Sequence, residues 1–433
     1  MKKFVALLLA LAMVFALCAC GNSNSAAPKQ DDAAESSQPS DNASENQSAA
    51  DLSALKVGFI FLHDENSTYD LNFMNAAKEA CETLGVESVF KTNIPEDQSC
   101  YEAAAELADA GCNIVFADSF GHEDYIIQAA KEFPKVQFCH STGTKAHTEG
   151  LDNYHNAFAS IYEGRYLAGV AAGLKLNEMI DNGDFAAEDA KIGYVGAYNY
   201  AEVVSGYTAF FLGVQSVYPD VQMEVMYTNS WFDIDKEGAA AEALIANGAV
   251  IIGQHADSTG APAATQKLKD SGKICYSIGY NIDMLDTAPT AALTSATNVW
   301  KVYYKELFEG AQAGSIPQDW CKGYEDGAVA ITDLGPEVAD GTAEKVAEVE
   351  AALKDGSLHV FDTSKFTVDG AEVTTAPIDL TYYDFSTGSP VAVYQGETKE
   401  AISDGYFHEG ELRAAPTFAL RIDGIIEDAD PVA

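Results

Sequence analysis

The feature that most constrains the fold is an alternation of short apolar runs with amphipathic helical stretches, from residue 55 to about residue 311. Residues 56–62 read KVGFIFL, a strand that is apolar on both faces. Residues 72–84 place their apolar side chains on one stripe of a helix. Continuous apolar strands joined by helices are typical of parallel sheets that helices cover on both faces. The sequence therefore predicts an α/β fold.

This alternation falls into two series with no sequence repeat between them, and each series is long enough for a doubly wound lobe of its own. The predicted strands are 56–62, 87–91, 114–117, 137–139, 191–195, 223–227, 250–253 and 273–278. The predicted helices are 72–84, 100–110, 125–132, 159–176, 203–217, 235–247, 261–269 and 297–311. We expect lobe 1 at 51–155, lobe 2 at 156–287, and segments that return to lobe 1 and form a hinge at 288–334. Residues 335–433 read as an acidic helix over 337–354, followed by a β-rich C-terminal extension rich in turn residues.

The N-terminus has the features of an export signal. Lys2 and Lys3 precede an apolar run over 4–17, which is too short to favour a membrane span. The run ends in Leu-Cys-Ala-Cys, which resembles a lipobox and makes Cys20 the lipid-modified first residue of the mature chain. The alternative is an ordinary signal peptide that ends in cysteine by chance. We therefore predict a lipoprotein signal peptide over 1–20 and a lipid anchor on the extracytoplasmic face of the cell membrane.

Composition limits the partners of the chain. Residues 21–50 contain no Ile, Leu, Val or aromatic residue, so we expect a disordered tether there. The 66 acidic residues outnumber the 25 Lys and Arg residues, for a formal charge of −41. A nucleic-acid binder needs a basic surface, so we expect no nucleic-acid partner, and membrane contact only through the lipid. The six cysteines beyond Cys20 read as buried free thiols, although export would also permit disulfides.

Polar and aromatic residues gather in the loops that follow six predicted strands. These loops are 63–69, 118–122, 197–199, 229–233, 254–258 and 279–283. Open α/β sheets bind ligands at the carboxyl ends of their strands, so we expect the six loops to face one cleft. Their aromatic residues are Tyr69, Phe120, Tyr198, Trp231, Phe232 and Tyr280. Aromatic faces can stack on a planar heterocycle while nearby amides and carboxylates contact its edge, although packing between the loops is the alternative for any single ring.

The sequence holds no complete motif among those tested for catalysis, metal binding or cofactor binding. Residues 233–238 begin like a calcium loop, but the position that needs a bidentate Glu is Leu244. Asp233 reads better as the cap of a following helix. The sequence holds no HExxH, P-loop, GxSxG or GxGxxG motif in the required context. We expect no catalytic residue, metal or cofactor.

Several segments, in order along both lobes, resemble the basic membrane protein family. They are EGRYLAG at 163–169, GYVG at 193–196, YTNSWFD at 227–233 followed by Lys236 and Glu237, QHADS at 254–258, and IGY at 278–280 followed by Asp283. Members of this family are lipoprotein substrate-binding components of ABC importers, related to purine-nucleoside receptors. The resemblance implies a type I periplasmic-binding fold, in which two lobes on a hinge close over a purine nucleoside or nucleobase. It also implies an ABC permease and an ATPase as partners.

The resemblance also implies roles for particular residues. Trp231 would stack on the ligand from lobe 2, and Tyr69 would be its counterpart in lobe 1. Ser119 and Phe120 would form the contact from the second loop. The family has a Gly-aromatic-Asp-x-Asp pattern, and its second acid is present here as Asp283. Its first acid, which would hold ribose hydroxyls, is replaced by Asn281, so the resemblance favours a base over a ribose-bearing ligand. The candidate ligand-binding residues are Asp64, Tyr69, Ser119, Phe120, Tyr198, Asn199, Trp231, Gln254, His255, Asp257, Ser258, Tyr280, Asn281 and Asp283.

The predicted function is delivery of a purine-like compound to an ABC permease. Two alternatives belong to other classes. One is a ligand-responsive accessory receptor for a membrane sensor, without a role in transport. The other is a hydrolase that processes a heterocycle with the acids Asp64, Asp257 and Asp283.

Overall fold

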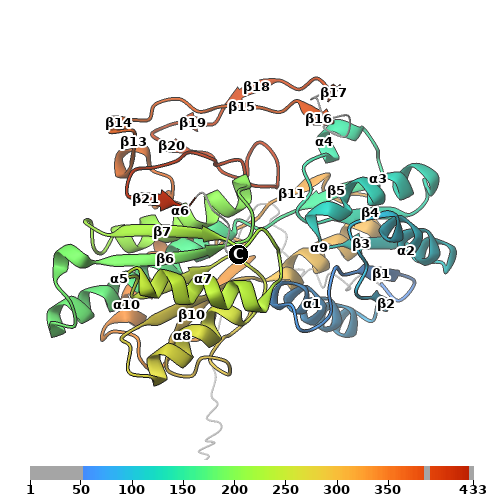
Figure 1. The fold of residues 1–433 in the computed structure, drawn as a ribbon. Coiled ribbons are helices and arrows are strands. Elements are labelled where there is room, and N and C mark those ends of the chain that lie inside the picture. The colour runs from blue at the N-terminus through green and yellow to red at the C-terminus, as the bar shows by residue number, and fades with distance from the viewer. Residues whose placement is uncertain (1–51, 385–390, 429–433) are drawn as a thin grey trace, which may run out of the picture. The chain divides into compact units, whose positions relative to one another are not determined.

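The computed structural model describes residues 52–384 and 391–428. The predicted leader, tether and lipidated Cys20 lie outside these residues. The described chain contains two large sheets (Figure 1). The first has the strand order β11-β5-β4-β3-β1-β2 and is parallel throughout. Its strands are β1 (Lys56–Ile60), β2 (Glu87–Lys91), β3 (Ile114–Ala117), β4 (Gln137–His140), β5 (Tyr154–Ala157) and β11 (Asp319–Trp320).

The second sheet has the order β12-β10-β9-β8-β6-β7-β21, and only the β10–β12 pair is antiparallel. Its strands are β6 (Lys191–Gly196), β7 (Gln222–Tyr227), β8 (Ile251–Gln254), β9 (Tyr276–Tyr280), β10 (Ala292–Asn298), β12 (Val329–Ile331) and β21 (Ile425–Glu427). Each sheet with its helices is called a lobe below. The α/β fold class with two parallel-sheet lobes is confirmed.

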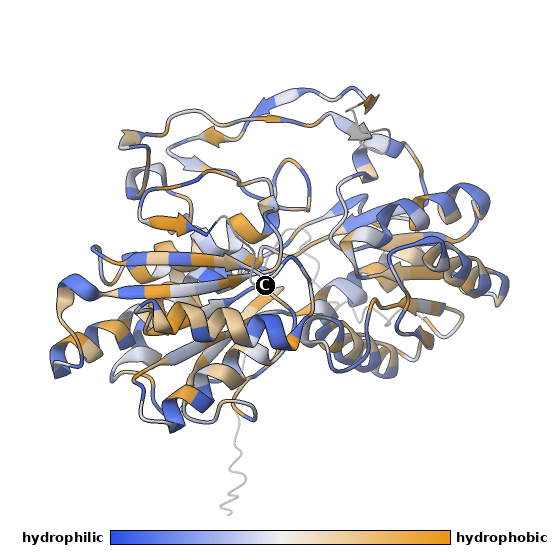
Figure 2. Ribbon diagram, in the orientation of Figure 1, coloured by the Kyte–Doolittle hydropathy of each residue, from blue (hydrophilic) through white to orange (hydrophobic). Residues whose placement is uncertain are grey.

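Helices cover both faces of each sheet, which explains the continuous apolar strands. In lobe 1, α1 (Thr68–Leu84) packs with α9 (Trp300–Ala313) on one face, and α2 (Gln98–Asp109) packs with α3 (Glu123–Glu132) on the other. In lobe 2, α5 (Ile161–Asn182) packs with α6 (Ala201–Gln215), and α7 (Ile234–Ala246) packs with α8 (Gly260–Asp270). In Figure 2 the strands of the first sheet are mostly apolar in colour, whereas α2 and α3 carry hydrophilic residues.

Helix ends follow local capping rules. Ser67 caps α1, and its side chain accepts a hydrogen bond from the backbone N–H of Asp70. Asp233 caps α7 through the N–H of Lys236, which confirms the capping interpretation of the calcium-like run. The helix predicted over 159–176 continues to Asn182, because it ends only where Gly183 takes the left-handed conformation with φ of 77°.

Two strands rich in polar residues differ from the prediction. The helix predicted over 297–311 begins only at Trp300, and the residues before it form strand β10. This strand reads ALTSATN, and its Thr, Ser and Asn residues do not give the apolar pattern expected of a buried strand. The strand is nonetheless buried inside the sheet. Strand β5 reads YHNA and was missed for the same reason. Neighbouring strands supply the hydrogen bonds and burial that composition does not indicate.

Up to β12, the chain passes between the lobes three times: from β5 to α5, from β10 to α9, and from β11 to β12. The segment 288–334 accordingly divides its elements between the lobes, with β10 and β12 in the second sheet and β11 in the first. Connecting segments of this kind allow two lobes to rotate about a hinge while each lobe keeps its own core.

The C-terminal part begins with α10 (Thr342–Lys354), which packs on α5. Beyond it lie four two-stranded antiparallel sheets, as the β-rich prediction requires. Their strands are β13 (Thr367–Val368), β14 (Ala371–Glu372), β15 (Pro377–Asp379), β16 (Tyr382–Asp384), β17 (Val391–Tyr394), β18 (Thr398–Glu400), β19 (Ile402–Ser403) and β20 (Tyr406–Phe407). The remaining short elements are α4 (Ala146–Glu149) and the 3₁₀ turns Phe120–His122, Ala187–Asp189 and Thr363–Lys365. The chain then returns to lobe 2, where β21 pairs in parallel with β7.

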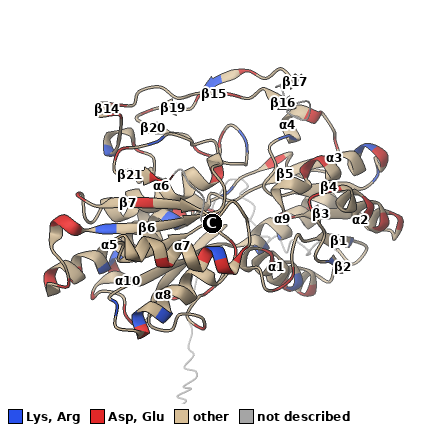
Figure 3. Ribbon diagram, viewed as in Figure 1, with Lys and Arg blue, Asp and Glu red and all other residues tan. Residues whose placement is uncertain are grey.

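Acidic residues are spread over the helices and loops of both lobes (Figure 3). Cys81, Cys100, Cys112, Cys139, Cys275 and Cys321 are all free thiols, as predicted. In the part of the chain that the structure describes, no helix is both long enough and apolar enough to cross a bilayer.

Candidate ligand-binding pocket

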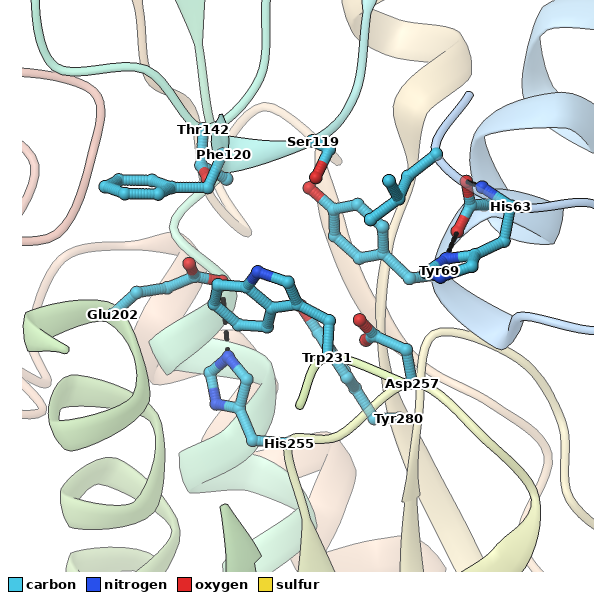
Figure 4. A pocket seen from close by; sticks show the side chains of 12 residues that line it. His63, Tyr69, Ser119, Phe120, Thr142, Glu202, Trp231, His255, Asp257 and Tyr280 are labelled. Atoms are coloured by element: carbon cyan, nitrogen blue, oxygen red, sulfur yellow. Dashed lines mark hydrogen bonds and ion pairs between the residues drawn. The ribbon is translucent and has the colours of Figure 1, made fainter. Parts of the chain in front are cut away.

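A pocket lies between the two lobes (Figure 4). Its lobe 1 residues are Leu62, His63, Tyr69, Asp70, Ser119, Phe120 and Thr142. Its lobe 2 residues are Glu202, Trp231, His255, Asp257 and Tyr280. Most of them follow the carboxyl end of a parallel strand, so the two sheets deliver loops from both sides to one site, as open α/β sheets do.

The first helix of lobe 1 fixes one side of the pocket. Tyr69 lies in the first turn of α1, where its hydroxyl donates to the carbonyl oxygen of Asp118 (2.9 Å) and its ring packs edge-on against Phe73. Asp70 is buried in the same turn. Its carboxylate accepts hydrogen bonds from the backbone N–H of His63 (2.8 Å) and from the hydroxyl of Ser67 (2.5 Å). These bonds hold the loop after β1 in place.

Aromatic rings form a connected group at the pocket. The Trp231 indole packs edge-on against Tyr198 at 5.0 Å between ring centroids, and its centroid lies 6.1 Å from that of Tyr200. Phe120 of lobe 1 lies 5.5 Å from Tyr200 and remains 38% exposed. In Figure 4, Phe120 and Trp231 extend toward the pocket from opposite sides. A flat ligand can therefore contact aromatic carbon from both lobes.

Lobe 2 contributes a buried acid next to a buried histidine. Glu202 lies in the first turn of α6, and its Oε1 is 3.2 Å from Nε2 of His255. Burial raises the pKa of Glu202 to about 7. Burial, and then the nearby Arg165 guanidinium, lower the pKa of His255 well below its usual range, so this imidazole is neutral at pH 7.

An arginine supports this wall from behind. The Arg165 guanidinium stacks 3.9 Å from the centre of the Tyr280 ring and donates to the hydroxyl of Tyr194 (2.6 Å) and the carbonyl oxygen of Gln254 (2.9 Å). Arg165 is buried and does not line the pocket. No Lys or Arg is among the lining residues.

Asp257 joins the two lobes through its backbone. Its carbonyl oxygen accepts hydrogen bonds from the N–H (2.8 Å) and hydroxyl (3.1 Å) of Thr68 in lobe 1. Its own N–H donates to the carbonyl oxygen of Trp231 (2.8 Å). Burial, followed by repulsion from Glu237, raises the pKa of the Asp257 carboxyl well above its usual range. The loop that carries this acid is therefore held at the contact between the lobes.

Half of the candidate residues line the pocket. They are Tyr69, Ser119, Phe120, Trp231, His255, Asp257 and Tyr280. Tyr198 lies behind Trp231. Gln254 and Ser258 are buried and do not line the pocket. The Gln254 amide donates to the carbonyl oxygens of Ala256 and Ser258 (both 2.9 Å), and the Ser258 hydroxyl accepts the N–H of Gly260 (3.0 Å).

The other four candidates lie away from the lining. Asp64 accepts hydrogen bonds from Asn66 within its own turn, and Asn199 is exposed and accepts a hydrogen bond from Arg421. Asn281 is buried with a left-handed φ of 67°, a conformation that Asn tolerates. Asp283 is exposed, and its carboxylate accepts the N–H of Leu285 (2.7 Å).

Five lining residues were not among the candidates: Leu62, His63, Asp70, Thr142 and Glu202. His63 stands in a loop that the sequence did single out. An acid in the first turn of a helix usually reads as a partner of the helix dipole, so Glu202 gave no separate signal. Within the described residues, no group of His, Cys, Asp and Glu side chains is arranged to hold a metal ion.

Comparison with known proteins identifies the family. Residues 60–357 match the Bmp family, described as PnrA-like ABC transporter substrate-binding proteins. The chain belongs to this family. The match covers most of both lobes and α10; it leaves out most of β1, the C-terminal two-stranded sheets and β21. The predicted resemblance is therefore confirmed, and a substrate-binding protein is a binding component and not an enzyme.

Relatives carry different ligand names. A purine-binding protein of Brucella abortus is 36% identical over 324 residues, which cover 73% of this chain and 86% of that protein. A putative ABC transporter glucose-binding protein of Haloferax volcanii is 32% identical over 60% of this chain and 62% of its own length. An ABC transporter solute-binding protein of Aeropyrum pernix has a similar structure, with a TM-score of 0.60 at 18% identity over 71% of this chain and 93% of that chain. This structural likeness confirms the periplasmic-binding fold.

Proposed function

We propose that this substrate-binding protein takes up a purine nucleobase or nucleoside in the pocket between its lobes and delivers it to an ABC permease and its ATPase. We further propose that Cys20 carries a lipid that anchors the protein on the extracytoplasmic face of the cell membrane. The residues of the described lobes bear on the first proposal, and the N-terminal sequence bears on the second.

One observation carries the ligand proposal: aromatic side chains from both lobes meet at a pocket whose edges are polar. Trp231 and Phe120 offer apolar faces, while Glu202 and Asp257 present carboxyl groups beside them. A purine has two flat apolar faces and a rim of nitrogen donors and acceptors, so it matches this distribution of groups. The Brucella abortus relative, named for purine binding, supports the same class.

The ligand would act by stabilising the arrangement in which both lobes contact it. Three connections between the lobes permit a hinge motion, and in the described arrangement Phe120 of lobe 1 and Trp231 of lobe 2 line the same pocket. A ligand shifts such an equilibrium by its extra contacts with the closed state. The absence of Lys and Arg from the lining disfavours a nucleotide, because no cation would offset its phosphate charge.

The test is calorimetry with purine bases, nucleosides and glucose on the purified protein and on Trp231→Ala. We expect a purine to bind and the substitution to weaken it at least tenfold, since loss of the indole face removes about 1.4 kcal/mol or more. Trp231→Phe is the matched control and should retain most of the affinity, because it keeps an aromatic face.

Unchanged affinity of the best purine for Trp231→Ala would contradict the stacking role. Binding of glucose and of no purine would overturn the ligand proposal while leaving the family intact. Glucose belongs in the panel because an aromatic face with carboxylates also suits a sugar, and because the Haloferax volcanii relative is named for it.

A further inference from the structure

Beyond α10, the C-terminal part of the chain is fixed to lobe 2 near both of its ends. Near its start, Phe361 stacks on Phe418 with 4.2 Å between ring centroids, and its ring lies 5.3 Å from that of Tyr162 on α5. Near its end, β21 pairs with β7, and the Glu427 carboxylate accepts a hydrogen bond from the hydroxyl of Tyr227 (2.9 Å). The two anchored ends therefore move with lobe 2.

Between these anchors lies a two-stranded antiparallel ribbon, which consists of β15 paired with β18 and of β16 paired with β17. Leu380 joins the two pairs, because its N–H donates to the carbonyl oxygen of Glu397 (3.1 Å). Beyond this bond Tyr382 stands directly opposite Tyr394. β15 and β18 are largely exposed, and in Figure 1 the ribbon runs from β13 and β14 toward α4 of lobe 1. Pairing along the ribbon thus ties the two tyrosines to the anchors in lobe 2.

The same two tyrosines contact lobe 1. The Lys145 ammonium group lies 4.1 Å from the centre of the Tyr382 ring, and the His147 ring lies edge-on to the Tyr394 ring with 6.1 Å between their centroids. Lys145 caps α4, and His147 lies within it. Lys145 is only 7% exposed, and an ammonium group shielded from water is attracted to an aromatic face more strongly than an exposed one. The far end of the ribbon is therefore held on lobe 1.

The stretch between β20 and β21 also contacts both lobes. The N–H of Ala414 donates to Oδ1 of Asp319 (2.9 Å) in β11, which is the edge strand of the first sheet. Arg421 donates to the side-chain oxygen of Asn199, which is two residues before the start of α6 in lobe 2. The C-terminal part, most of which lies beyond the family match, is thus connected to both lobes.

We propose that the ribbon holds the two lobes closed in the unliganded protein. Rotation about the hinge would separate Tyr382 and Tyr394 from Lys145 and His147, so the open state loses these contacts. The closed state keeps them, because the structure in which they form also contains the hydrogen bond that joins the lobes at the pocket. A protein that is already closed binds its ligand with a higher apparent affinity, since less binding free energy is spent on closure. The inference holds whichever ligand the pocket takes.

The backbone amide of Thr68 reports directly on closure. Thr68 is the first residue of α1, so its N–H has no partner within the helix. This N–H donates instead to the carbonyl oxygen of Asp257 in lobe 2 (2.8 Å). Separation of the lobes breaks this bond and exposes the amide to exchange with solvent, while the core of each lobe stays folded.

The experiment is hydrogen exchange of the unliganded protein, followed by mass spectrometry of overlapping peptides that isolate the amide of Thr68. The variant carries Tyr382→Ala and Tyr394→Ala together. We expect the Thr68 amide to exchange at least threefold faster in this variant, while the amides of β4 and β6 keep their rates. The matched control carries Tyr382→Phe and Tyr394→Phe, and it should keep the rate of the unmodified protein because both aromatic rings remain.

An unchanged rate at Thr68 in the double alanine variant would overturn the inference. A Thr68 amide that exchanges in the unmodified protein as fast as an unprotected amide would also overturn it, because the lobes would then be open despite the ribbon. Faster exchange throughout β4 as well as at Thr68 would show that the ribbon stabilises lobe 1 itself, and this result would likewise contradict a role in closure.

Discussion

Replacement of Glu202 by Gln should change how the stability of the unliganded protein depends on pH. The Glu202 side chain is 11% exposed, and burial raises its pKa from 4.5 to about 7. Below pH 4.5 the carboxyl is protonated in both the folded and unfolded states and contributes no pH dependence. Between pH 4.5 and 7 the folded state holds the proton more tightly, so the free energy of unfolding falls as the pH rises. Above pH 7 the full cost of the buried charge is present.

The magnitude follows from the same shift. A pKa that rises from 4.5 to about 7 on folding corresponds to a loss of at most about 3 kcal/mol. Partial exposure and relaxation around the charge lower this figure, so we expect ~1–3 kcal/mol. Gln keeps an oxygen that can face His255 but has no proton to lose. The free energy of unfolding of Glu202→Gln, relative to that of the unmodified protein, should therefore be higher at pH 8 than at pH 5 by this amount.

The assay is urea unfolding of the unmodified protein and Glu202→Gln at pH 5 and pH 8, followed by circular dichroism. Burial also raises the pKa values of Glu163 and Glu237 to about 7, so both proteins lose stability over this range. Only the difference between them reports on Glu202. Glu372→Gln supplies the control for removal of one exposed charge. Identical pH dependence in the unmodified protein and Glu202→Gln would refute the reasoning, since the acid would then bear no cost of burial.

Two further predictions concern other parts of the chain. Gly213→Ala should lower the free energy of unfolding by about 1–3 kcal/mol, because its Cβ would lie 2.1 Å from the carbonyl oxygen of Tyr166 where α6 crosses α5. Gly238→Ala on α7 is the control and should be neutral or stabilising, because its Cβ would meet no atom closer than 3.5 Å. Equal effects of the two substitutions in urea unfolding would contradict this account of the crossing. Cys20→Ser should move the protein from the detergent-rich to the aqueous phase in detergent partitioning of cells that produce it, and an unchanged distribution would exclude the lipid anchor.

The amino-acid sequence determined the architecture because that architecture depends on periodicity. Apolar strands such as 56–62 and amphipathic helices such as 72–84 can be read from the order of apolar and polar residues, and their alternation allows few topologies. Strand ends then predict where ligand loops gather, so Trp231, Asp257 and Tyr280 were found without coordinates. The motif at 227–233 indicated the family because its residues are contiguous in the sequence and can be recognised without the fold.

Only the tertiary structure decided which side chains of those loops enter the pocket. Gln254 and Asp257 stand three residues apart, yet the Gln254 amide is taken by backbone carbonyls while the Asp257 carboxylate remains unpaired. Asn281 adopts a left-handed φ of 67° inside the protein, while Asp283 lies exposed beyond it. Glu202 reaches the pocket from the first turn of α6 because its helix packs beside His255. Hydrogen bonding and packing between segments far apart in the chain set these orientations, so they cannot be predicted from the local sequence.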